Sequence, residues 1–127
     1  MTPEQVIKIV CEVMGLDVDL FKGVEGKRPS QAGIYPFGRH ISVYLIRKEH
    51  DKFYSYESIA HTLGNKRKDG KGDRSATLYN EWIAKVLIKN KDKEFCGWLI
   101  KVETEILKQN VNSIPDKNFS RRKNTSK

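Results

Sequence analysis

Residues 55–89 read SYESIAHTLGNKRKDGKGDRSATLYNEWIAKVLIK, and this stretch predicts two helices joined by a basic turn. The first helix has a serine cap at Ser55, apolar residues at helical spacing and a terminating glycine at Gly64. The second helix is capped by Asp73 or Ser75. Helical spacing predicts that this second helix buries the residues Leu78, Tyr79, Trp82, Ile83, Val86 and Leu87.

The turn at residues 65–72 is the most basic stretch of the chain. Its cations are Lys66, Arg67, Lys68 and Lys71. The turn is too polar and too rich in glycine for a helix, so we expect it to be exposed. It does not fit a phosphate-binding P-loop, because Gly64 and Gly70 are one residue too far apart and Gly72 stands where serine or threonine is required.

Upstream of this stretch, the sequence predicts a helix followed by a basic loop. Residues 2–5 form the start of a capping box, and Gly15 is placed to end the helix. One more helical turn, capped by Asp17, follows. Residues 22–36 are rich in glycine, proline and basic side chains and have no apolar period, so we expect a positively charged loop there.

Two further helices complete an all-α prediction, since no convincing strand pattern is present. One begins at Phe37 or Arg39 and runs to His50, and the other is capped near Asp92. The face of this last helix carries Phe95, Trp98, Leu99, Val102 and Ile106. Residues 113–127 are basic and almost free of apolar side chains, so they predict a disordered tail after a domain at residues 1–112.

The charge balance favours a polyanionic partner. The 127 residues contain 24 Lys and Arg against 16 Asp and Glu, which gives a formal net charge of +8. Nucleic acid is the leading candidate, and an anionic membrane surface or an acidic protein is an alternative. Because no run approaches the roughly 18 apolar residues of a membrane-spanning helix and no secretory signal is evident, we expect a soluble, cytoplasmic, nucleoid-associated protein.

The sequence gives no sign of catalysis or of a cofactor. Cys11 and Cys96 have apolar neighbours and are expected to be buried free thiols. The three histidines, His40, His50 and His61, do not have the spacing of metal ligands, and no nucleophile, histidine and acid stand out as a set. We therefore expect a protein that is not an enzyme and that needs no metal or cofactor.

The pair of helices around the basic turn suggests a way to bind DNA. A short helix, a turn and a longer helix with a polar first turn are the parts that place a helix N-terminus in the major groove. That first turn offers Arg74, Ser75 and Thr77. The alternative interpretation is two ordinary packed helices with a solvated charge run between them.

The chain resembles the C-terminal DNA-binding domain (domain IV) of the bacterial chromosomal replication initiator DnaA over nearly its whole length up to about Leu107. The string RHISVYLIRKE at residues 39–49 is similar to the family's long helix, and SYESIAHTLG at residues 55–64 is similar to the first helix of its helix-turn-helix. The resemblance implies an all-α helical bundle containing a helix-turn-helix, similar to the DnaA C-terminal or Trp-repressor-like fold.

The resemblance also implies roles for single residues. Arg28, with Lys27 as a second choice, stands where the family's basic loop enters the minor groove, and arginine suits a narrow, electronegative groove. The positions that match phosphate-backbone contacts are Arg39, His40, Ser55 and Tyr56. The positions that match the base-reading start of the recognition helix are Asp73, Arg74, Ser75, Ala76 and Thr77. The basic turn, with Lys66, Arg67 and Lys71, would contact flanking phosphates.

Two departures from the family change the expected DNA site. The turn is longer than the family's two or three residues, and Arg74 or Ser75 replaces its signature histidine. Arginine binds guanine through O6 and N7, so we expect a different site or weak sequence preference. Because 127 residues starting at Met1 leave no room for the initiator's ATPase domain, we expect no ATP binding, nucleotide-driven oligomerisation or origin melting.

The resulting hypothesis is a protein that binds double-stranded DNA in replication or transcription control. One alternative is an adaptor that binds a protein partner of the replication machinery, favoured by the long turn and the missing histidine. A second alternative is an RNA-binding module. Base stacking requires exposed aromatic side chains, and Trp82 and Trp98 are expected on buried apolar faces, which counts against this second alternative.

Overall fold

The computed structural model describes residues 1–23, 28–50 and 53–113. Its helices, in chain order, are α1 (Pro3–Met14), α2 (Val18–Lys22), α3 (Tyr35–His50), α4 (Tyr56–Thr62), α5 (Arg74–Lys89) and α6 (Lys93–Ser113). The expected all-α class is confirmed for the described ranges, which hold helices and no strand longer than a single bridge. Of the tail predicted at residues 113–127, Ser113 ends α6, and residues 114–127 lie outside the described residues.

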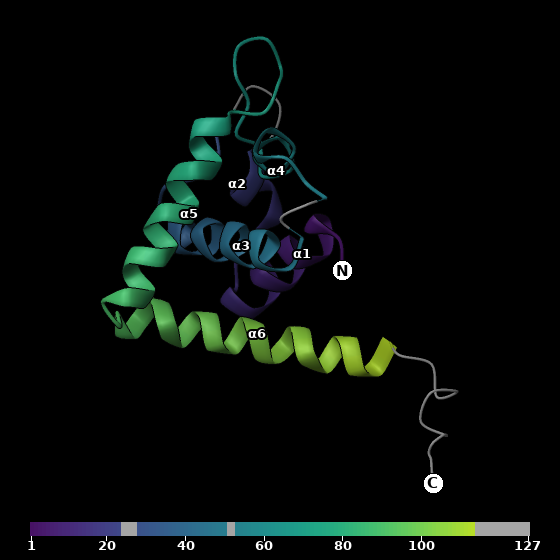
Figure 1. Cartoon of the computed structure of the whole chain (residues 1–127), viewed down its shortest axis with the longest axis vertical. Helices are drawn as coiled ribbons and strands as arrows, with labels where there is room; N and C mark the ends of the chain where they lie inside the picture. The colour runs from purple at the N-terminus through teal and green to yellow at the C-terminus, as the bar shows by residue number, and fades with distance from the viewer. Residues whose placement is uncertain (24–27, 51–52, 114–127) are drawn as a thin grey trace, which may run out of the picture.

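The helices surround a central α3 (Figure 1). Helix α3 packs against α1 on one side and against α5 on another, and α6 covers the end of the bundle through its contacts with α1 and α5. Helix α4 lies at the end opposite α6, next to the N-terminal end of α5 (Figure 1). None of the described helices has the length and apolar character that a membrane crossing needs.

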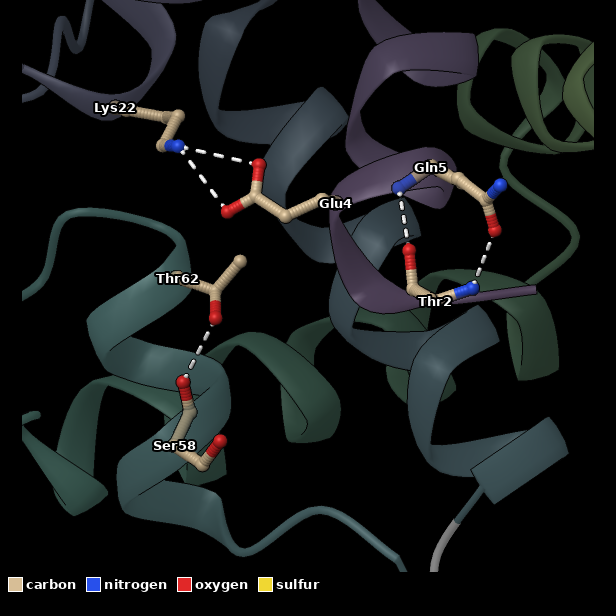
Figure 2. Close-up of polar contacts among 6 residues, drawn as sticks. All are labelled: Thr2, Glu4, Gln5, Lys22, Ser58 and Thr62. Atoms are coloured by element: carbon tan, nitrogen blue, oxygen red, sulfur yellow. Dashed lines mark hydrogen bonds and ion pairs between the residues drawn. The ribbon is translucent and has the colours of Figure 1, made fainter.

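Local capping chemistry sets where most helices begin. The predicted capping box is present at α1, where the Thr2 hydroxyl accepts from the Gln5 amide at 3.2 Å and the Gln5 side chain accepts from the Thr2 amide at 2.7 Å (Figure 2). The other caps expected from the sequence are confirmed at Asp17, Ser55, Asp73 and Asp92. Helix α3 begins at Tyr35, earlier than expected, because Pro36 is well tolerated in a first helical turn.

The core is built from apolar side chains of α1, α3, α4 and α6, with Phe21 of α2, Leu63 directly after α4 and Ala84 of α5. Its fully buried members include Ile7, Ile9, Val10, Phe21, Ile41, Ile46, Ile59, Leu63, Phe95 and Val102. An edge-to-face contact between Phe37 and Phe95, with ring centroids 5.4 Å apart, joins α3 to α6. Cys11 is buried as expected, whereas Cys96 is only half-buried, and both are free thiols.

Helix α5 buries only part of the apolar stripe that its spacing predicted: Leu87 packs against the core, but the residues that are fully buried lie outside the stripe. The buried residues are Thr77, Asn80 and Ala84, while Tyr79 and Trp82 are 58% and 60% exposed. Thr77 donates a hydrogen bond to the Tyr56 carbonyl at 2.7 Å, and the Asn80 side-chain oxygen lies 2.6 Å from Nδ1 of His40. The neighbouring helices thus present polar groups that only polar α5 residues can satisfy, and this overrides the apolar period.

The long turn between α4 and α5 forms a compact hairpin. The Arg67 amide donates to the Lys71 carbonyl at 2.7 Å, and the Gly70 amide donates to the Arg67 carbonyl at 2.9 Å. Gly70 has a φ of 84°, and the Asp69 carboxylate accepts from the Lys71 amide and pairs with Arg67. We call residues 65–73 the basic hairpin; it projects beyond the helices next to the start of α5 (Figure 1).

Candidate nucleic-acid interface

A groove of about 1040 Å³ lies beside the basic hairpin. It is bounded by the end of α2, residues 28–31, the last turn of α4, the basic hairpin and the first turn of α5. Its described lining includes the cations Lys22, Arg28, Lys66, Arg67 and Lys68 and the acids Glu4 and Asp73. We call this feature the basic groove, since its cations outnumber its acids and it would attract a polyanion.

A buried arginine fixes one wall of the basic groove. Arg39 donates to the carbonyl of Phe21 at 3.2 Å and to the carbonyl of Ser30, so it joins the end of α2 to residues 28–31. The Ser30 amide also donates to the Leu20 carbonyl at 2.8 Å. These bonds hold the backbone beside Arg28, whose own side chain is exposed at the groove.

The opposite wall is set by close contact between the basic hairpin and α4. A Cβ added at Gly72 would lie 1.8 Å from the Glu57 carbonyl oxygen, so the two backbones touch at this point. The Asn65 amide donates to the Ala60 carbonyl, and the Asp73 amide donates to the Asn65 carbonyl, both at 2.8 Å. The hairpin is therefore attached to α4 at one end and to the start of α5 at the other.

Two lining residues come from the N-terminal part of the chain. The Lys22 ammonium lies 3.3 Å from both oxygens of the Glu4 carboxylate, which joins α2 to α1 (Figure 2). This exposed pair neutralises part of the charge of the wall.

On α4, the Thr62 hydroxyl donates to the Ser58 carbonyl at 3.0 Å, so its donor is already used within the helix (Figure 2).

The first turn of α5 carries an exposed arginine beside an aromatic ring. The Arg74 guanidinium carbon lies 5.0 Å from the centre of the Tyr56 ring, within the range of a cation–π contact. The Tyr56 hydroxyl accepts from Arg47 at 3.0 Å and lies 3.3 Å from the Glu81 carboxylate. Arg47 also lies 4.2 Å from the centre of the same ring. Tyr56 is thus a half-buried support for Arg74, with its hydroxyl engaged inside the protein.

The structure brings some of the sequence-predicted residues together. Arg28, Lys66 and Arg67 line the basic groove, and Lys71 is exposed on the same hairpin. Arg74 and Ser75 are exposed at the start of α5 but do not line the groove. Ser55 is exposed and caps α4, with its hydroxyl accepting from the Ser58 amide. Lys27 lies outside the described residues.

Three predicted contact residues are corrected, because they are buried and bonded inside the protein. Arg39, His40 and Thr77 are 3%, 7% and 0% exposed. Each has an internal partner: loop carbonyls for Arg39, Asn80 for His40 and the Tyr56 carbonyl for Thr77. The expected phosphate contacts of Arg39 and His40 and the expected base contact of Thr77 are therefore not supported. Polar side chains of this kind are expected in solvent from the sequence alone, because their internal partners are brought beside them only on folding.

Desolvation shapes the protonation of this buried polar region. Burial lowers the pKa of His40, the Asn80 hydrogen bond raises it and the nearby Arg39 charge lowers it. Burial alone lowers the pKa of Arg39.

On α1, burial raises the pKa of Cys11 to about 11, with Asp17 as a secondary cause, so this thiol stays protonated near neutral pH.

The groove also contains residues that the sequence did not single out as site residues. These are Lys22, Pro29, Gln31, His61, Thr62 and Asn65. His61, Thr62 and Asn65 flank Gly64, which directly precedes Asn65 and the rest of the basic turn. Their closeness to this turn in the sequence was the signal that could have indicated them. Among the described residues, no group of three His, Cys, Asp or Glu side chains is placed to hold a metal ion.

Comparison of the chain with protein-family models, with curated proteins and with solved structures finds no match.

Proposed function

We propose that this protein binds double-stranded DNA through the basic groove and the first turn of α5. The observation that carries the proposal is the gathering of Arg28, the cations of the basic hairpin and the N-terminal end of α5 around one open groove. These parts come from segments far apart in the sequence. Cations spread along a surface contact phosphates, and a helix end beside them is the usual reader of the major groove.

In this proposal α4 and α5 act as a helix-turn-helix of the kind implied by the resemblance to the DnaA C-terminal domain. The basic hairpin takes the place of the short turn and flanks the DNA as a small wing, with Lys66, Lys68 and Lys71 toward phosphates. Arg28, on the far wall of the groove, reaches into the adjacent minor groove. Such a protein would act on the chromosome, in replication or transcription control.

The start of α5 is better suited to reading bases than to holding a phosphate. The Asp73 carboxylate accepts from the Ser75 amide at 3.0 Å, and the Asp73 carbonyl accepts from the Ala76 amide at 3.1 Å. These amides are engaged, and a carboxylate stands at the helix end, so an incoming phosphate gains little there. Arg74 remains exposed beside this cap and has the geometry to bind guanine O6 and N7.

The salt dependence of binding tests the proposal. Duplexes selected from a random pool at near-physiological salt would be titrated with protein at several salt concentrations. If about five to seven phosphates are contacted, log affinity falls against log salt with a slope of roughly −4 to −6. A flat salt dependence, or a pool from which no duplex is retained, would refute duplex binding.

The substitution Arg74→Ala tests whether α5 is the reading element. Loss of a bidentate guanine contact costs on the order of 1–3 kcal/mol and relaxes the sequence preference. The control is Lys108→Ala, an exposed lysine on α6, which we expect to leave the affinity for the selected duplex nearly unchanged. Equal losses from both substitutions would show binding by diffuse charge without a recognition helix.

A further inference from the structure

The solvent-facing side of α5 carries two exposed aromatic rings. Tyr79 and Trp82 lie one helical turn apart, with ring centroids 6.4 Å apart and planes inclined by 46°. The His40 ring packs edge-on against Tyr79 at 6.3 Å, which holds the tyrosine ring in place. Leu78 and Val86 lie one turn before and after Trp82 on the same side. Large exposed rings in a row are unusual on a small protein and mark a binding surface.

The charges around these rings are positive. Lys85 and Lys89 are exposed and follow Trp82 by three and seven residues, so they continue the row along the helix. The single acid of α5, Glu81, has its carboxylate 3.5 Å from Arg47 and 3.6 Å from Lys85. Helix α5 therefore offers no unpaired carboxylate beside the rings. We call this row of residues 78, 79, 82, 85, 86 and 89 the α5 outer face.

The α5 outer face is separate from the basic groove. The α5 side chain that lines the groove is Ala76, next to the Asp73 cap, and none of the outer-face residues does so. Trp82 is eight residues beyond Arg74, which is about 12 Å along a helix. The major groove is about 8.5 Å deep, so a helix that enters it by its N-terminal end leaves Trp82 outside. A duplex bound in this way would therefore leave the rings accessible to a second ligand.

We propose that the α5 outer face binds a single strand of nucleic acid. Unpaired bases would stack on the rings of Trp82 and Tyr79, and the strand's phosphates would lie along Lys85 and Lys89. A duplex cannot bind in this way, because its bases are already stacked on one another. The combination of aromatic rings and exposed lysines, one of them paired with Glu81, matches a polyanion with flat apolar faces better than it matches an apolar protein surface. This proposal does not require that the duplex proposal be correct.

Trp82 itself reports on the binding. In Trp98→Phe protein, Trp82 is the only tryptophan of the chain, so its fluorescence isolates the outer face. Stacking predicts quenching of this fluorescence on titration with a 15-nucleotide oligodeoxythymidylate or oligouridylate. Comparison of the two oligonucleotides distinguishes DNA from RNA as the preferred strand. If neither oligonucleotide binds the folded protein near physiological salt, the proposal is wrong.

A matched pair of substitutions locates the site. Trp82→Ala should weaken oligonucleotide binding by roughly 5- to 150-fold, the range expected for one lost stacking contact. Ile100→Ala removes a similarly exposed apolar side chain from α6 and should leave binding unchanged. Circular dichroism and thermal melting confirm that both variants fold. An unchanged affinity of Trp82→Ala, or an equal loss in both variants, would overturn the proposal.

Three further measurements separate this site from its competitors. A blunt-ended duplex of two fully paired strands should bind Trp82→Ala as well as it binds wild type, whereas a failure of wild type to bind this duplex would refute the duplex proposal alone. If sedimentation shows that wild type is a dimer and Trp82→Ala a monomer, a second copy covers the outer face, and the single-strand proposal fails. If oligonucleotide binding is lost on removal of Lys66 and Lys68 instead of Trp82, the strand lies in the basic groove, and the proposal also fails.

Discussion

Buried polar residues position the candidate interface from behind. Arg39 fixes the backbone beside Arg28 through two carbonyls, and Thr77 fixes the start of α5 to the start of α4. His40 joins α3 to α5 through Asn80. None of these three side chains lines the basic groove, yet a change in any of them would shift residues that do. They are therefore positioning residues, and removing a partner from such a bond leaves a buried polar group unsatisfied.

The pairing of His40 with Asn80 predicts a stability that depends on pH. The Asn80 amide nitrogen donates to the Ala76 carbonyl, so its oxygen faces His40 and accepts from Nδ1. Desolvation lowers the pKa of His40 in the folded state, and so the neutral ring is favoured there. The stability that it contributes is fully present above the unfolded value of about 6.5 and is lost as the pH falls through the lower, folded pKa.

Urea unfolding of wild type between pH 7.5 and pH 5 should show this loss. The slope in free energy of unfolding reaches at most about 1.4 kcal/mol per pH unit for one such proton. His40→Gln removes the titrating ring and should flatten the slope, while the exposed His61→Gln should retain the wild-type slope. The groups that face His40 are Asn80 and Tyr79 on α5 and Phe37 and Arg39 on α3. Identical slopes for His40→Gln and wild type would show that the ring does not control the acid response.

At the scale of the elements, glycine decides how closely the basic hairpin approaches α4. Gly72→Ala would place a Cβ 1.8 Å from the Glu57 carbonyl oxygen and 2.9 Å from the His61 amide nitrogen. Since these are backbone atoms, the hairpin must move, at a cost of about 1–3 kcal/mol. The displaced hairpin should also weaken duplex binding, measured by fluorescence anisotropy.

Gly97→Ala provides the matched control, because nothing lies within 4 Å of a Cβ added there in α6. Replacing a helical glycine by alanine should raise stability by about 0.5–1 kcal/mol and leave duplex binding unchanged. The two changes are chemically the same and differ in their surroundings. A stable Gly72→Ala protein with unchanged affinity would show that the hairpin seat on α4 does not matter for binding.

The elements also show what the sequence could predict. The starts of α1, α2, α4, α5 and α6 were predictable because a cap is a bond between residues two or three positions apart. The buried face of α5 was not, because it depends on His40 and on the Tyr56 carbonyl, 40 and 21 residues away. Because α5 buries this polar face, Trp82 is exposed. Its exposure removes the main objection to contact with single-stranded nucleic acid.

The candidate interface also has a part that the sequence could predict and a part that it could not. The exposed basic hairpin could be predicted from composition alone, because a segment of lysines and glycines has no apolar side chains to bury. Arg39 was misassigned because the two carbonyls that it satisfies belong to Phe21 and Ser30, which the chain brings beside it only on folding. The internal partners of buried polar groups come from tertiary structure, and a single sequence does not display them.

At the scale of the whole molecule, α5 serves both proposed surfaces. Asp73 and Ala76, at its start, line the basic groove. The helix runs from there to its junction with α6 (Figure 1). The two surfaces are presented by one rigid helix, so a bound duplex and a bound strand would have a fixed relation to each other. This arrangement suits a junction at which a duplex continues into an unpaired strand. Simultaneous binding of a duplex and a strand can be measured.

Net charge alone could also draw this protein to DNA, and charge-matched variants separate that effect from a specific surface. Lys66→Ala with Lys68→Ala, and Lys93→Ala with Lys108→Ala, each lower the net charge from +8 to +6. The first pair lies on the basic groove, and the second is exposed on α6. Long-range attraction depends on the total charge and should change nearly equally in the two double variants, whereas phosphate contacts depend on position.

The variant of the basic hairpin should therefore lose about 1.8 from the magnitude of the log–log salt slope, 0.9 for each released counterion, and the α6 variant should keep the wild-type slope. Equal slopes for the two variants, measured on the same selected duplex, would remove the basic hairpin from the interface.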